Sequence, residues 1–169
     1  MRRSALALVL ALVGALAVPA AVAAPQAKKA PPTDVYKVAI DRGVSLADAA
    51  DSMRLRANAL NLKLVAELPL SKQVEVMTDT AQRTITIFQF CDAVTAKDLI
   101  DLNLDFSVYM PCRIALIEDE KGQGWLVMMD VNVDAVAKEK RLPDALKTRI
   151  QEVRESLVSI MRAGAHGEL

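Results

Sequence analysis

Two cysteines, Cys91 and Cys112, are the residues in this sequence best suited to covalent or redox chemistry. Because 20 residues separate them, they do not form the Cys-x-x-Cys motif of thiol oxidoreductases. In an oxidising compartment, a disulfide is the simplest use of two cysteines in one domain. The alternatives are a thiol pair that cycles between redox states or binds a ligand, and two buried, inert thiols.

The sequence around each thiol differs. Cys91 lies shortly before a predicted helix start at Thr95, where backbone amides and the helix dipole favour a thiolate, and nothing comparable precedes Cys112. Together with Met110, the two cysteines offer the soft sulfur ligands that suit Cu(I). A zinc site is not supported, because His166 is the only histidine and two cysteines do not complete a tetrahedral site. We therefore predict no metal or cofactor, with copper as the alternative.

Arg113 is the third residue with a chemical role to explain. In an extended strand it shares a face with Ala115 and Ile117, so its guanidinium lies on a largely apolar surface. A guanidinium in that position needs a carboxylate, a carbonyl or an anionic ligand. A structural ion pair is the simpler interpretation, and anion binding in a pocket is the functional one. The carboxylates that could form the ion pair are Asp92, Asp105 and Asp130.

Recognisable catalytic motifs are absent from the sequence. It contains no nucleophile elbow, no glycine-rich phosphate loop and no histidine placed to act as a base. The acidic run of residues 118–120 falls at a predicted hairpin turn, where solvated charge is the ordinary explanation. We therefore favour a non-enzymatic protein.

The N-terminus has the pattern of a cleaved export signal. Arg2 and Arg3 precede an apolar run over residues 5–18, and the small residues Ala21 and Ala23 form a signal-peptidase site. We predict a Sec signal peptide over residues 1–23 and a periplasmic or secreted mature protein. The apolar run is shorter than the roughly 20 residues that span a bilayer, so no membrane span is predicted.

Residues 24–33 are rich in Pro, Ala and Lys and are predicted to form a disordered linker. Loss of Arg2 and Arg3 with the signal peptide leaves 19 basic against 21 acidic residues, a net charge near −2. Nucleic acid is therefore not an expected partner, because its binding requires a clustered basic face.

The remaining chain predicts an α+β fold. Ser45 with Asp48, and Thr95 with Asp98, indicate capped helix starts, and Ser71 indicates a further short helix. We expect two layers, with a mainly antiparallel sheet of about five strands and helices packed on one face. Several strands are apolar on both faces, so a second cover for the sheet is implied. The predicted strands are residues 34–40, 62–68, 84–90, 112–118 and 124–131, the last two forming a hairpin.

An amphipathic helix is predicted in the C-terminal tail, where apolar residues recur at steps of three and four from Leu146 to Ile160 and the helix stops where Gly164 and Gly167 begin. We accordingly divide the chain into an α+β domain over residues 34–132 and a C-terminal helical extension over residues 133–169. Packing on the sheet is the simpler role for this helix, and docking of a partner is the alternative.

Two segments carry a resemblance to a known family. Residues 87–92 (IFQFCD) and 110–114 (MPCRI), followed by an acidic hairpin with Gly122 and an apolar strand, resemble the domain-of-unknown-function 302 family. The resemblance covers about residues 35–131 and leaves the tail helix outside. It implies a compact α+β fold and a tendency to dimerise, and it brings no established activity or catalytic residues.

Two functional hypotheses follow. The first is a periplasmic, non-enzymatic binding or interaction module, a homodimer, that holds an unknown small ligand or protein partner. Its site is the uncovered sheet face or a pocket near Cys91, Cys112 and Arg113. The second is a thiol-based redox or soft-metal-handling protein that uses Cys91 and Cys112.

Overall fold

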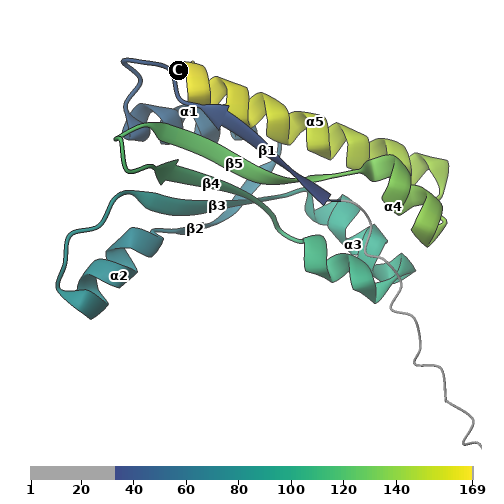
Figure 1. Cartoon of the computed structure of the whole chain (residues 1–169). Coiled ribbons are helices and arrows are strands. Elements are labelled where there is room, and N and C mark those ends of the chain that lie inside the picture. The colour runs from purple at the N-terminus through teal and green to yellow at the C-terminus, as the bar shows by residue number, and fades with distance from the viewer. Residues whose placement is uncertain (1–32, 169) are drawn as a thin grey trace, which may run out of the picture.

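Five strands form a single antiparallel sheet in the order β1-β5-β4-β3-β2 (Figure 1). This computed structural model describes residues 33–168, so the predicted signal peptide and all but the last residue of the predicted linker lie outside it. The predicted α+β class is confirmed, and every strand pairing is antiparallel. The strands are β1 (Thr33–Ala39), β2 (Lys63–Leu68), β3 (Ile85–Cys91), β4 (Cys112–Glu118) and β5 (Gly124–Val131).

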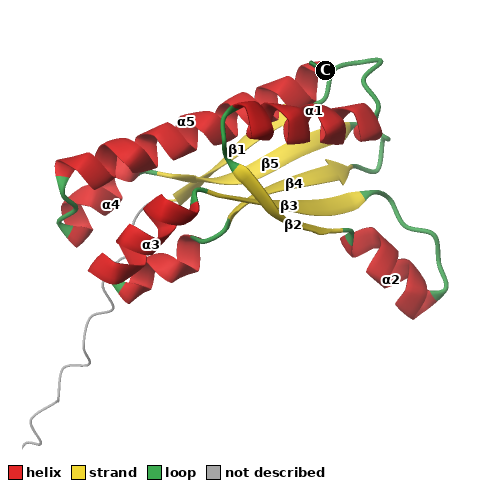
Figure 2. Cartoon of the chain, turned by 180° about the vertical axis from the view of Figure 1, so that it is seen from behind, coloured by secondary structure: helices red, strands yellow, loops and turns green. Residues whose placement is uncertain are grey.

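Helices lie on both sides of this sheet. The long helices α1 and α5 cross one face, whereas α2 lies near one end of the other face and α3 with η1 near the opposite end (Figures 1 and 2). No helix among residues 33–168 has the length and apolar character needed to cross a membrane. The helices are α1 (Leu46–Ala59), α2 (Leu70–Thr78), α3 (Ala93–Leu102), the 3₁₀ helix η1 (Leu104–Tyr109), α4 (Val133–Lys140) and α5 (Asp144–His166).

The predicted capped start of α1 at Ser45 is confirmed. The Ser45 hydroxyl accepts a hydrogen bond from the Asp48 amide at 3.0 Å and donates one to the Asp48 carboxylate at 2.7 Å. At the other end, Asn61 takes the left-handed conformation, with φ +56°, that ends the helix. The chain then turns directly into β2.

The core lies between the sheet and the pair α1 and α5. Successive strand residues point to opposite faces, and the ones directed at these helices are the most deeply buried apolar side chains of the sheet. Leu157, Ile160 and Met161 of α5 belong to the same core. The predicted boundary at residue 132 therefore does not separate two units, because the tail helix completes the core of the domain. The core strand residues are Phe88, Phe90, Ile114, Leu116, Leu126 and Met128.

Gly164 lies inside α5, so of the two glycines predicted to stop this helix only Gly167 does so. A Cβ at this position would lie 2.6 Å from Met53 Cγ and 3.0 Å from the Ala49 carbonyl oxygen, so the missing side chain lets α5 approach α1 closely. The helix continues to His166 and ends at Gly167, whose φ of +66° requires a residue that tolerates the left-handed region.

Two predicted helix starts are displaced. Asp92, not Thr95, caps α3, since its carboxylate accepts hydrogen bonds from the amides of Val94 and Thr95, each at 3.1 Å. Ser71 does not cap α2, which begins at Leu70 without a side-chain cap. The Ser71 hydroxyl instead accepts a hydrogen bond from the Ile85 amide at 3.2 Å, which ties α2 to β3. Neither α4 nor η1 is predicted from the sequence.

The second face of the sheet has no helix across its middle, and we call it the open face. Its side chains alternate with those of the core. Lys37, Lys63 and Arg113 are basic, and none of its described strand residues is acidic. The ammonium of Lys37 lies 3.7 Å from the centre of the Trp125 ring. The apolar members include Val35, Ala39, Ala66, Leu68, Ile85, Ile87, Ala115, Ile117, Trp125, Val127, Met129 and Val131.

Candidate functional site

The sheet divides in two at one end. Strands β4 and β5 pair from Glu118 and Gly124 as far as Ile114 and Met128. Beyond that point β4 continues only along β3, where Cys112 pairs with Phe90, and β5 continues only along β1. The ladder between β4 and β5 is therefore missing at this end, and the two strand pairs separate.

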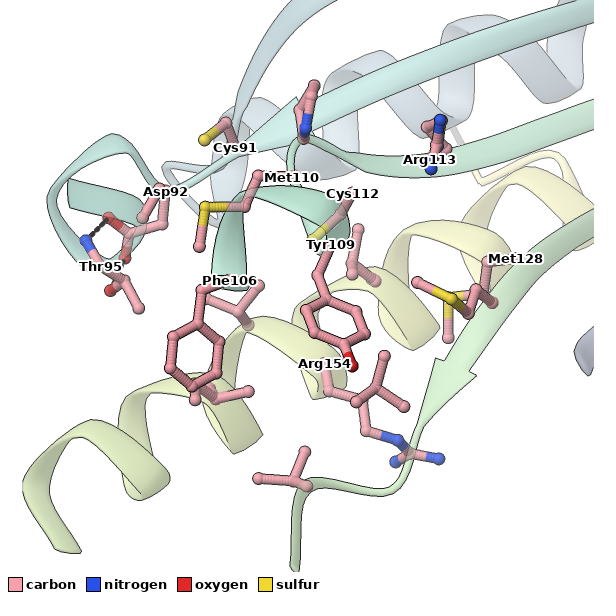
Figure 3. A pocket seen from close by; sticks show the side chains of 18 of the residues that line it. Cys91, Asp92, Thr95, Phe106, Tyr109, Met110, Cys112, Arg113, Met128 and Arg154 are labelled. Atoms are coloured by element: carbon pink, nitrogen blue, oxygen red, sulfur yellow. Dashed lines mark hydrogen bonds between the residues drawn. The ribbon is translucent and has the colours of Figure 1, made fainter. Parts of the chain in front are cut away.

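An apolar cleft of about 440 Å³ lies where the strands diverge (Figure 3). It runs from the open face, at Val127 and Met129, into the space under α5, at Val153 and Leu157. Its size falls in the range of roughly 300 to 1,000 Å³ that is usual for small-molecule sites. Other apolar residues that line it include Val35, Ile87, Ala96, Leu99, Phe106, Met110, Ala115, Met128, Val131, Val133, Val136 and Ile150.

Two of the four charged side chains that line the cleft, Arg154 and Asp92, are held by other groups. Arg154 of α5 forms two hydrogen bonds to the Asp130 carboxylate, with N–O distances of 2.6 and 2.8 Å. Burial tends to raise the pKa of Asp92. Its hydrogen bonds with Thr95 and Val94 and the nearby charge of Arg149 outweigh burial and lower it overall. Asp92 is therefore an ionised helix cap.

Arg113 also lines the cleft, and it is exposed at the rim. The predicted structural ion pair is wrong, because each of the three candidate carboxylates is committed elsewhere. Asp92 caps α3, Asp105 bonds to Lys140 at 2.6 Å, and Asp130 bonds to Arg154. Within residues 33–168 no salt bridge involves Arg113, so its guanidinium is free to meet an anion.

Both cysteines lie at the cleft, but the predicted disulfide is not formed, and each carries a free thiol. Cys112 pairs with Phe90, the neighbour of Cys91, so the two side chains leave opposite faces of the sheet. The described residues contain no group of three or more His, Cys, Asp or Glu arranged to hold a metal ion.

The predicted activation of Cys91 by the helix start is wrong. Burial and the adjacent charge of Asp92 raise the pKa of the Cys91 thiol, since Asp92 itself occupies the helix cap. Burial, with a further contribution from Cys91, raises the pKa of Cys112 to about 11. Both thiols are therefore protonated at neutral pH, which makes them poor nucleophiles.

We expect slow alkylation of Cys112 without reductant. With a pKa near 11, its thiolate fraction near pH 8 is about a hundredfold below that of an unperturbed thiol. Intact-mass measurement of native protein during iodoacetamide treatment should show Cys112 reacting at most about one hundredth as fast as free cysteine. Alkylation that occurs only after reduction would instead reveal a disulfide and contradict the free thiols.

These features define an α+β protein with one five-stranded antiparallel sheet and an apolar cleft at the split end of that sheet. The chain belongs to the family described as domain of unknown function DUF302, whose family model matches residues 36–164. The match includes α4 and most of α5, so the tail helix is a family element and not the addition that the sequence resemblance implied.

A solved structure supports the fold. The crystal structure of an uncharacterized conserved DUF302 protein from Bacillus stearothermophilus superposes with a TM-score of 0.60. The two chains are 13% identical, and the match covers 76% of this chain and 96% of the other. At this identity the likeness concerns the fold alone. No curated protein matches the sequence.

Proposed function

We propose that this protein is an exported, non-enzymatic binding module whose small, largely apolar ligand occupies the cleft between β4 and β5. The observation that carries the proposal is the separation of the two strand pairs over an apolar space of about 440 Å³. A space of this size lined by apolar side chains favours a ligand that removes its own apolar surface from water.

The state of the cysteines supports binding over the thiol-based alternative. A redox pair needs two sulfur atoms that can meet, and Cys91 and Cys112 leave opposite faces of the sheet. A thiolate nucleophile or metal ligand needs a low pKa, and both thiols have raised ones. We therefore assign the two cysteines to the wall of the cleft.

The test is equilibrium binding of an uncharged apolar fluorophore, N-phenyl-1-naphthylamine, followed by its fluorescence. The proposal predicts saturable binding of one molecule per chain, since one cleft is available. A signal that never saturates, or a stoichiometry of several molecules per chain, would indicate nonspecific adsorption to the open face and contradict the proposal.

We also propose that the protein is a homodimer that associates through α2. Val76 and Met77 on this helix are 87% and 85% exposed, the highest values among the large apolar residues of the described chain. The neighbouring charges Lys72 and Glu75 pair with each other at 2.9 Å and so would not repel a second copy. The open face is less suitable, because two copies would bring only basic groups together.

Sedimentation velocity tests this interface. The wild-type protein should sediment as a dimer, and Met77→Lys should weaken association by about tenfold or more, because it places a charge in an apolar contact. Val108→Lys is the matched control, since Val108 is 67% exposed on η1, away from α2. A monomeric wild type, or equal effects of the two variants, would refute the α2 interface.

A further inference from the structure

Arg113 is the feature of the cleft that the apolar lining leaves unexplained. It lies at the rim, and all three of its candidate carboxylate partners are held by other groups. An arginine side chain presents five N–H donors and no acceptor, so the complementary group is an anion with two or more oxygens.

The strand residues that share a face with Arg113 add no competing negative charge. Lys37 and Lys63 lie on the same face, and no described strand residue of that face is acidic. Asp34 also lines the cleft. It lies opposite Asp130 in the register of β1 and β5, so its side chain points to the helix-covered face and not to the open face. Among the described strand residues of the open face, Arg113 is thus the one charged residue that lines the cleft, and the ionised Asp92, which also lines it, is held by its hydrogen bonds at the start of α3.

The walls that α5, α3 and η1 contribute to the cleft are largely apolar. Leu157, Val153 and Ile150 of α5 form one wall, and Leu99 and Phe106 form another. The Cys112 thiol, which also lines the cleft, is neutral at physiological pH because burial raises its pKa. The charge of a ligand would therefore be stable only at the rim, and its apolar portion only inside.

We propose that the ligand is a single-headed anionic amphiphile, whose carboxylate or similar oxyanion binds the Arg113 guanidinium while its hydrocarbon portion enters the cleft toward Leu157. This inference rests on the proposed function, since it names the class of ligand for the same cleft. It gives Arg113 the role of selecting the charged head, and the apolar walls the role of holding the chain.

Displacement of N-phenyl-1-naphthylamine by decanoate and by decanol tests the inference, because the two compounds share a chain and differ in head-group charge. In Arg113→Gln, decanoate should bind about tenfold or more weakly than in the wild type, and decanol equally well. Lys37→Gln is the matched control, because it removes a basic group from the same face at a different strand. Low ionic strength keeps the exposed charge from being screened.

The outcomes separate this inference from the proposed function. If the fluorophore and decanol fail to bind the wild type, the cleft itself is not a ligand site. If both bind the wild type, the cleft is a ligand site. If Arg113→Gln then leaves decanoate affinity unchanged, or weakens decanoate and decanol binding equally, Arg113 does not bind an anionic head group. Equal losses of decanoate affinity in Arg113→Gln and Lys37→Gln would also overturn it, by showing a general charge effect.

Discussion

Truncation of the chain after Pro143 is expected to abolish cooperative folding. The deletion removes α5, and with it the buried side chains of Leu157, Ile160 and Met161. Truncating one such residue to alanine costs about 2 to 5 kcal/mol, whereas a whole domain is stable by only about 5 to 15 kcal/mol. Far-UV circular dichroism during urea unfolding should therefore show no cooperative transition for the truncated chain.

The same experiment decides between the two roles predicted for the tail helix. The double variant Glu152→Ala with Glu155→Ala is the control for the helix surface, because both residues are exposed. Each substitution should change the free energy of unfolding by no more than about 0.5 kcal/mol. Ile160→Ala keeps the helix and should lower the free energy of unfolding by about 2 to 5 kcal/mol. A truncated chain that unfolds cooperatively would make α5 a docking element and refute its place in the core.

Filling the cleft is expected to remove ligand binding while the fold is retained. Ala96 lines the cleft from α3 and is half-buried, so Ala96→Phe places a benzyl group in space that the ligand would occupy. We expect the affinity for N-phenyl-1-naphthylamine to fall by at least tenfold, about 1.4 kcal/mol. Fluorescence titration of the wild type and the variant measures the change.

The matched control for this variant lies on the same helix. Ala93 is exposed and does not line the cleft, so Ala93→Phe makes the same chemical change outside the site. It should bind the fluorophore with wild-type affinity. If both variants bind normally, the fluorophore occupies another surface. If both lose binding and stability together, the effect lies in α3 and not in the cleft.

The fold was largely predictable because its signals are local. Short apolar runs predicted β3, β4 and β5 to within one residue, and the Ser45 cap predicted the start of α1. Gly164 was misleading for a nonlocal reason. In sequence it indicates a helix end, whereas in space it permits close contact with Ala49 and Met53.

The candidate site was predictable only in part. Cys91, Cys112 and Arg113 were identified from their residue types, and all three line one cleft. The cleft depends on where β4 stops pairing with β5, and no residue type marks that position. The freedom of Arg113 could not be predicted either, because Lys140 and Arg154, which occupy the competing carboxylates, come from elements that are distant in sequence.

Methionine methyl resonances give the most direct test that the cleft is the ligand site. Met110, Met128 and Met129 line it, Met53 and Met161 lie in the core with α1 and α5, and Met77 is exposed on α2. On saturation with N-phenyl-1-naphthylamine, we predict that NMR will show large shifts for the three cleft methyl groups and none for Met77. Bound fluorophore with unmoved cleft resonances, or with the main shift at Met77, would contradict the account.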